Sequence, residues 1–169
     1  YDSGTYQKQD NLFTIMIIGG SQGAKIFDEL LNKSLIGVAK QVAIKIIHQT
    51  SEKNINFLKN FYSQNNIENK VFSFDHNLNK ILKQSDLCIT RAGASSLAEL
   101  SFLNIPFIAA PLPSSKDNHQ YENANYYKEQ GCCWIIDQKN FDDQKFEKFL
   151  LELANKSQDY MTKKNNLQK

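Results

Sequence analysis

Arginine is nearly absent from this chain of 169 residues, because Arg91 is the only arginine among its 20 basic residues. The lysines are spread along the chain and the formal net charge is only +2, which argues against a nucleic-acid-binding protein. No apolar run approaches the ~20 residues that a membrane-spanning helix needs. The N-terminal residues are polar and show no signal peptide pattern. Because the chain begins with Tyr1 rather than methionine, we interpret Tyr1 as an internal residue of a longer protein.

Cysteine is also scarce, which excludes a disulfide-stabilised framework. The three cysteines are Cys88, Cys132 and Cys133; two of them are adjacent, and all lie in apolar segments where thiols pack as small hydrophobic groups. These features predict a reduced, cytoplasmic protein. No cysteine or histidine cluster has the spacing of a metal site, and there is no Asp-x-Asp pair to hold a metal-bound diphosphate.

Short apolar segments alternate with helical patterns along most of the chain. The predicted strands cover residues 13–18, 42–48, 71–74, 86–90, 106–110 and 132–136. Helices between successive strands indicate βαβ units, and therefore a parallel sheet with helices on both faces. The predicted fold class is α/β, with one Rossmann-like domain over residues 12–156. Residues 1–11 are expected to form a linker or frayed segment, and residues 157–169 a polar tail that is also frayed.

The first predicted strand ends in a glycine-rich loop, GGSQGA, at residues 19–24. Such a turn before a helix offers backbone N–H groups to an anion, and Ser21 and Gln22 add side-chain donors. The dinucleotide-binding fingerprint is broken, because Ile18 occupies the place of its first glycine and no acidic residue ends the second strand. The glycines could instead serve backbone geometry alone. Anion binding and a purely structural turn both remain open.

The loop after the fourth predicted strand contains Arg91 and leads into a helix near Ala94. The first amides of that helix, at Ala94, Ser95 and Ser96, are unpaired donors that suit a phosphate. Glu99 lies on the same helical face as the two serines, where its carboxylate could accept hydrogen bonds from both hydroxyls of a ribose. The alternative is a capping box formed by Ser96 and Glu99, which would stabilise the helix and bind nothing.

A third polar loop, PLPSSKDNHQ, follows the fifth predicted strand at residues 111–120. The amide groups of Asn118 and Gln120 and the imidazole of His119 could bind sugar hydroxyls. The alternative is a solvated turn with Asp117 as the helix N-cap. Since the carboxyl ends of parallel strands lie at one edge of the sheet, the three loops together predict a site for a phosphorylated, hydroxyl-rich ligand such as a nucleotide sugar.

Four segments carry a resemblance to a known family: GGSQGAKIFDELLNKSL, HQT, TRAGASSLAEL and PFIAAPLPSSKDNHQYENANYYKEQGCCWIID. Over roughly residues 12–156 the chain resembles the C-terminal half of the MurG family. These enzymes are UDP-N-acetylglucosamine:undecaprenyl-pyrophosphoryl-muramoyl-pentapeptide N-acetylglucosaminyltransferases, which convert lipid I to lipid II in peptidoglycan synthesis. The resemblance implies one half of a GT-B glycosyltransferase that inverts the anomeric centre without a metal or cofactor. In this chain Arg91 falls on the family's arginine.

The resemblance also implies where the donor's diphosphate would bind. Ser21 and Gln22 would contact the diphosphate from the glycine-rich loop. Ala94, Ser95 and Ser96 would contribute amides and hydroxyls from the helix that follows the second loop.

The remaining donor contacts that the resemblance implies involve the nucleoside and the sugar. Glu99 would bind the ribose hydroxyls, Phe74 would cap the uracil, and the backbone of Asp75 would read its edge. Gln120 would bind a hydroxyl of the N-acetylglucosamine, with His119 beside it. This sequence departs from the family at Asp75, where an aliphatic residue is usual, and at His119, where a second glutamine is usual. A third departure is Ser51, in place of glycine.

The family's N-terminal domain is not part of this sequence. The resemblance places in that domain the lipid I acceptor site, the membrane-facing surface and the catalytic base, which leaves the base unidentified here. We therefore expect UDP-GlcNAc to be the ligand of this chain, with weak binding and little or no turnover. The full enzyme would work at the cytoplasmic face of the inner membrane. Alternatives are a separate donor-binding subunit of a two-chain lipid-linked glycosyltransferase and a non-catalytic nucleotide-binding module.

Overall fold

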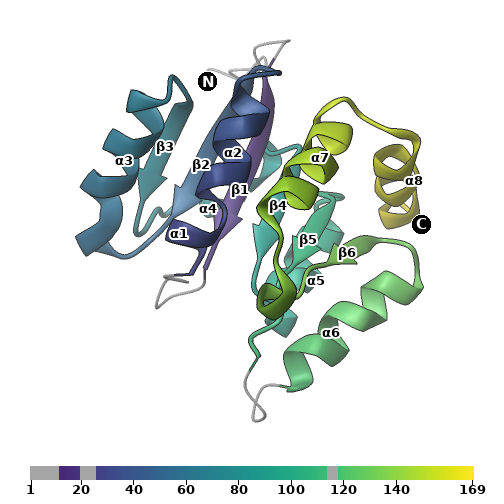
Figure 1. The fold of residues 1–169 in the computed structure, drawn as a ribbon. Helices are drawn as coiled ribbons and strands as arrows, with labels where there is room; N and C mark the ends of the chain where they lie inside the picture. Colours follow the sequence, from purple (N-terminus) through teal and green to yellow (C-terminus); the bar gives the residue numbers. More distant parts are fainter. Residues whose placement is uncertain (1–11, 20–25, 114–117) are drawn as a thin grey trace, which may run out of the picture.

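A six-stranded sheet forms the centre of the molecule (Figure 1). The computed structural model describes residues 12–19, 26–113 and 118–169. The strand order is β3-β2-β1-β4-β5-β6, and all neighbouring strands are parallel, which confirms the predicted sheet. The strands are β1 (Phe13–Ile18), β2 (Ile44–Gln49), β3 (Glu68–Phe72), β4 (Leu87–Thr90), β5 (Phe107–Ala109) and β6 (Cys133–Ile135).

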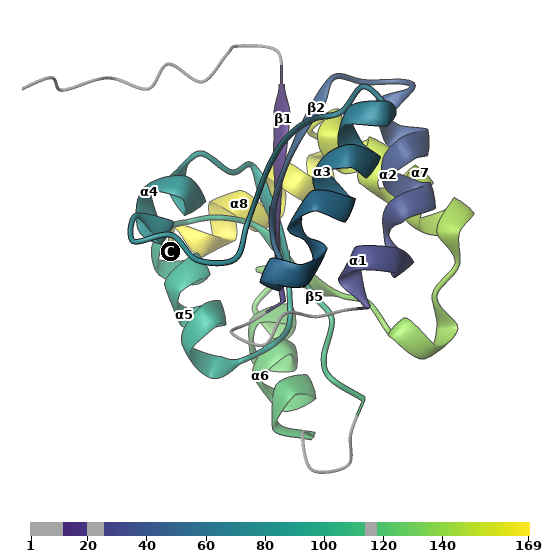
Figure 2. The same ribbon diagram turned by 90° about the vertical axis from the view of Figure 1, so that its left-hand side faces the viewer.

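Helices cover both faces of the sheet, as the alternating sequence pattern predicts (Figure 2). The helices described are α1 (Phe27–Leu30), α2 (Asn32–Ala39), α3 (Ile55–Gln64), α4 (Leu78–Lys83), α5 (Ala94–Phe102), α6 (Asn118–Glu129), α7 (Asp143–Ala154) and α8 (Gln158–Leu167), with 3₁₀ turns η1 (Glu52–Asn54) and η3 (Gln138–Asn140). One buried cluster joins the sheet to α1, α2, α3 and α7. A second cluster joins the opposite face to α4, α5 and α6. The apolar strands are thus buried on both sides, as parallel sheets require.

Two element boundaries differ from the sequence prediction. The sequence pattern between the first two strands predicts one helix over residues 23–39, whereas in the part described the structure has a break at Leu31 that separates α1 from α2. Strand β3 covers residues 68–72 instead of 71–74, which leaves Phe74 in the turn beyond the strand. Only the last two residues of β3 are buried, because it is an edge strand. Its first three residues, Glu68, Asn69 and Lys70, are all polar, so the sequence gives no strand signal there.

The expectation of a frayed tail from residue 157 is wrong. Helix α8 occupies residues 158–167, and its Tyr160 and Leu167 are buried. The Tyr160 hydroxyl donates to the backbone oxygen of Asp86 at 2.7 Å, and Asn166 Nδ2 donates to the backbone oxygen of Gly131 at 2.9 Å. The helix looks polar in sequence because a few side chains make all of its packing contacts.

Candidate functional site

The carboxyl ends of β1, β4 and β5, after which the predicted ligand loops begin, lie at one edge of the sheet, at the lower side of Figure 1. The chain runs from β1 outward to β3 and then crosses back to β4, so the strand order reverses between β1 and β4. Their carboxyl ends are in register, with Ile18 paired to Thr90. In open parallel sheets such a reversal leaves a crevice where ligands bind. The turns after β1 and β4 therefore flank the expected ligand position.

The start of α5 excludes the capping-box alternative. Gly93 is the N-cap of this helix, no side chain caps it, and the Leu97 amide donates to the Gly93 oxygen at 3.1 Å. Ser96 is therefore the third residue of the helix and cannot be its cap. The amides of Ala94, Ser95 and Ser96 lack the intrahelical partners that later residues have. Ala94 and Ser95 are exposed, so this helix end is open to a ligand.

Arg91 links several segments of the chain at the carboxyl edge of the sheet. Its Nη1 atom donates to the backbone oxygen of Ala110 at 3.2 Å and to Gln138 Oε1 at 2.7 Å. Its guanidinium also lies over the ring of Phe27, 5.1 Å from the centroid. Partial burial lowers the pKa of Arg91, but an arginine keeps its charge at neutral pH. The one arginine thus joins the turn after β4 to β5, η3 and α1.

Gln120 also makes contacts between loops. Its Oε1 atom accepts hydrogen bonds from the amides of Ala92 at 3.2 Å and Leu112 at 3.1 Å. Asn123 Nδ2 donates to the Ala92 oxygen at 3.0 Å, so α6 holds both backbone groups of Ala92. Because Oε1 faces these amides, a sugar hydroxyl would be met by the Nε2 donor of Gln120. His119 is exposed, with Nδ1 3.9 Å from Glu122 Oε2.

The turn after β3 presents Phe74 to solvent. The Phe74 side chain is 71% exposed and packs edge-on against His76 at a centroid distance of 4.9 Å. The Asp75 carboxylate is turned away into its own loop, where Oδ1 accepts from the Asn77 amide at 2.7 Å and Oδ2 lies 3.3 Å from Lys70 Nζ. The hydrogen bond from Asn77, followed by that from Lys70, lowers the pKa of Asp75. Because the Asp75 side chain has these partners, an aspartate at this position is compatible with a nucleobase that binds to the backbone of the same residue.

Comparison with known proteins agrees with this geometry. The sequence profile of the glycosyltransferase family 28 C-terminal domain matches residues 14–169. The chain belongs to this family. The match includes α8, which the predicted boundary at residue 156 had left outside the domain.

Two curated relatives of this family 28 domain have the same name, UDP-N-acetylglucosamine–N-acetylmuramyl-(pentapeptide) pyrophosphoryl-undecaprenol N-acetylglucosamine transferase. That of Pelagibacter ubique (strain HTCC1062) is 41% identical over 167 residues, which is 99% of this chain and 47% of the relative. That of Rickettsia massiliae (strain Mtu5) is 40% identical over 155 residues, 90% of this chain and 41% of the relative. The chain thus spans about half the length of the curated relatives it matches.

Solved structures support the same assignment. The crystal structure of Acinetobacter baumannii MurG matches with a TM-score of 0.84 and 26% identity, covering 95% of this chain and 48% of that one. The C-terminal CMP-Kdo binding domain of WaaA from the same organism shares the fold, with a TM-score of 0.68 at 10% identity, over 94% of this chain and 89% of that one. The family 28 domain is therefore a GT-B glycosyltransferase domain.

Two predicted ligand contacts and one buried cluster of the family 28 domain remain to be described. Ser21 and Gln22 lie outside the described residues. Sequence analysis missed Asp28, which is 4% exposed and binds side chains at the end of β2. The available signal was an acidic residue in an otherwise apolar helical stripe. His48 at the end of β2 is buried, and its Nδ1 atom is hydrogen-bonded to the Tyr62 hydroxyl.

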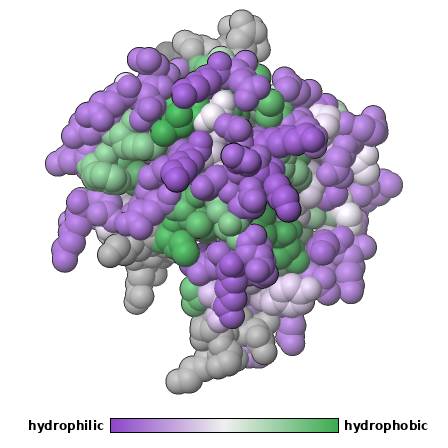
Figure 3. All heavy atoms as spheres, in the orientation of Figure 1, coloured by the Kyte–Doolittle hydropathy of each residue, from purple (hydrophilic) through white to green (hydrophobic). Residues whose placement is uncertain are grey.

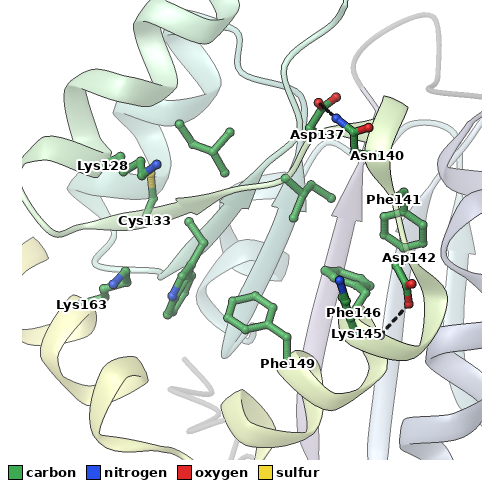
Figure 4. A pocket seen from close by; sticks show the side chains of 13 residues that line it. Lys128, Cys133, Asp137, Asn140, Phe141, Asp142, Lys145, Phe146, Phe149 and Lys163 are labelled. Atoms are coloured by element: carbon green, nitrogen blue, oxygen red, sulfur yellow. Dashed lines mark hydrogen bonds between the residues drawn. The ribbon is translucent and has the colours of Figure 1, made fainter.

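A cavity of about 550 Å³ lies beside the edge strand β6 (Figure 4), and none of the predicted donor residues is among the described residues that line it. Aromatic side chains of β6 and α7 form much of its wall, including Trp134 and Phe149, and Lys128, Lys145 and Lys163 lie around it. Figure 3 shows hydrophobic residues reaching the surface beside α7. Within residues 12–19, 26–113 and 118–169, no cluster of potential metal ligands occurs. Over the same residues, no helix has the length and apolar character needed to cross a membrane.

Proposed function

We propose that this domain binds UDP-GlcNAc as the donor half of an inverting, metal-independent N-acetylglucosaminyltransferase. The complete enzyme would transfer N-acetylglucosamine to undecaprenyl-pyrophosphoryl-muramoyl-pentapeptide, converting lipid I to lipid II. The observation that carries the proposal is the 41% identity to the Pelagibacter transferase over 99% of this chain. The position of the carboxyl ends of β1, β4 and β5 at one edge of the sheet supports it.

The start of α5 has the chemistry needed to stabilise the departing UDP. In a direct displacement at the anomeric carbon, negative charge develops on the diphosphate as the glycosidic bond breaks. The amides of Ala94, Ser95 and Ser96 have no side-chain cap at this helix N-terminus, where fixed dipoles favour that charge. Ser21 and Gln22, which follow β1, would add hydrogen-bond donors from the other side of the point where the strand order reverses. No metal ion is required in this scheme.

Recognition of the rest of the donor is assigned to four residues. Glu99 lies one turn into α5, where its carboxylate would accept hydrogen bonds from the two ribose hydroxyls. The exposed Phe74 ring would stack on the uracil, and the Asp75 backbone would bind its edge. Gln120, oriented by its bonds to Ala92 and Leu112, would donate to a hydroxyl of the sugar.

The acceptor side of the reaction is assigned to the other half of the longer enzyme. Lipid I binding, membrane contact and the catalytic base would reside there, at the cytoplasmic face of the inner membrane. The isolated domain should then bind the donor weakly and catalyse almost no transfer. A measurable rate of transfer from this chain alone to a lipid I analogue would contradict this assignment.

The first test is a calorimetric titration of the chain with UDP-GlcNAc, UDP-glucose, UDP-GalNAc and UDP. We expect a preference for UDP-GlcNAc and a loss of at least about tenfold in affinity for Glu99→Ala, because two hydrogen bonds to a charged group disappear. Glu152→Ala, which removes an exposed carboxylate from α7, is the matched control and should bind normally. Equal affinities for UDP and UDP-GlcNAc would instead favour a non-catalytic nucleotide-binding module.

A further inference from the structure

A continuous row of aromatic rings lines the cavity beside β6. Trp134 packs edge-on against Phe149 with 5.7 Å between the ring centroids, and Phe149 lies 6.3 Å from Phe146. Phe141 continues the row, 5.1 Å from Phe146. All four rings line the same cavity of about 550 Å³, a volume within the ~300–1,000 Å³ typical of small-molecule sites. The row therefore gives the cavity an elongated apolar wall (Figure 4).

Positive charge gathers at the Trp134 end of this row. The Lys163 ammonium lies 5.0 Å from the centroid of the Trp134 ring, and Lys128 lies beside Cys133 in Figure 4. Burial raises the pKa of Cys133 to about 12, while the charges of Lys163 and Lys128 act to lower it, so both ammonium groups lie near the same thiol. Because Lys163 is paired with Asp159 at 2.8 Å, the excess positive charge at this end comes from Lys128.

The acidic residues of the lining lie at the other end of the cavity. Asp137 and Asp142 are on the opposite side of it from Lys128 in Figure 4. Both carboxylates accept local hydrogen bonds, Asp137 from the Lys139 amide at 2.9 Å and Asp142 from the Lys145 amide at 3.0 Å. With the ammonium of Lys145, the two carboxylates leave this end with an excess of negative charge. The cavity is therefore cationic at one end, apolar in the middle and acidic at the other end.

We propose that this cavity binds a single-chain anionic amphiphile, of the class of a carboxylate with a long apolar chain. The chain would lie along the aromatic row, and the carboxylate beside Lys128 and Lys163, away from the acidic end. A hollow of this volume accommodates one such chain, whereas attachment to a bilayer needs apolar side chains that reach into the lipid. The inference goes beyond the proposed function and does not depend on it, because no predicted donor residue is among the described residues that line the cavity.

The fluorescence of Trp134 provides a direct test, because this residue is the only tryptophan of the chain and lies in the cavity wall. Titration with decanoate, below its micellar concentration, should shift the emission to shorter wavelength and reach saturation. Hexanoate, which is four methylene groups shorter, should bind at least about tenfold more weakly, because it buries less apolar surface. Absence of a saturable change with decanoate would overturn the proposal.

Charge reversal at Lys128 tests where the carboxylate binds. In Lys128→Glu we expect decanoate to bind about fivefold more weakly, and decanol, which has the same chain length and no charge, to bind as it does to wild type. Lys128 is exposed, so the variant should fold normally. The matched control is Lys80→Glu, which reverses the charge of an exposed lysine on α4, outside the cavity lining. Equal decanoate affinities in the two variants would overturn the proposal.

The same measurement identifies other occupants of the cavity. A shift of the Trp134 emission that grows with protein concentration in the absence of decanoate would indicate a second copy of the chain, and would overturn the proposal. A response to vesicles of anionic phospholipid, with none to decanoate, would indicate membrane docking and would also overturn it. UDP-GlcNAc should bind equally with and without decanoate. Failure of UDP-GlcNAc to bind, with a normal response to decanoate, would contradict the proposed function alone.

Discussion

At the scale of single residues, Arg91 shows how one side chain can hold several loops in place. Its guanidinium contacts a backbone oxygen, a side-chain amide and an aromatic ring that belong to three different segments. A planar guanidinium can bond in its plane and stack at the same time, whereas the compact ammonium of lysine cannot. This explains, in physical terms, why the site uses the only arginine of a lysine-rich chain.

We predict that Arg91→Lys lowers the free energy of unfolding by about 1–2 kcal/mol, because the stacking and one of the two hydrogen bonds are lost. Urea denaturation followed by circular dichroism would measure the change. Lys139→Arg, an exposed substitution in η3, serves as the control and should leave stability unaltered. Unchanged stability of Arg91→Lys together with weaker UDP binding would show that Arg91 acts on the ligand instead.

At the scale of elements, the ends of helices decide how the layers fit together. Gly131 follows α6 with φ of +70°, and a Cβ there would lie 2.7 Å from Asn166 Nδ2 of α8. The same asparagine donates to the Gly131 oxygen, so the close approach joins α6 to α8. Asn104, after α5, has a similar φ of 58° but already carries a side chain. The two helix ends share a backbone conformation and differ in the space around it.

Gly131→Ala should therefore destabilise the domain by about 1–2 kcal/mol, through the left-handed conformation and the displacement of Asn166. Thermal unfolding of the variant would show a lower Tm than wild type. The converse substitution, Asn104→Gly, places glycine where the backbone already favours it and should change Tm little. If Gly131→Ala unfolded at the wild-type temperature, the contact between α6 and α8 would be unimportant for stability.

At the scale of the whole molecule, α8 completes the packing of the sheet. Tyr160 is 1% exposed, stacks edge-on against Phe13 at 5.8 Å and bonds to the Asp86 oxygen, so it reaches the amino ends of β1 and β4. Trp134 Nε1 donates to Asp159 Oδ2 at 2.8 Å, which attaches α8 to the edge strand β6. The last helix thus contacts both the centre and the edge of the sheet.

Removing residues 157–169 should lower the free energy of unfolding by about 3–5 kcal/mol, because Tyr160 leaves a buried site and its hydrogen bond is lost. Chemical denaturation would measure the loss, and Tyr160→Phe would isolate the hydrogen bond at about 1 kcal/mol. A shortened chain as stable as the full one would contradict the packing role of α8.

The sequence by itself determined the class of fold and the places of the candidate ligand loops. Alternating apolar and helical segments predicted the parallel sheet, and small polar residues after the first, fourth and fifth strands identified the loops, because both signals are local. The tertiary structure decided which of the candidate side chains make contacts within the fold. It excluded the Ser96 cap, showed the bracing contacts of Arg91, paired Asp28 with His48 and ordered α8. Such contacts join residues far apart in the chain, and no local pattern records them.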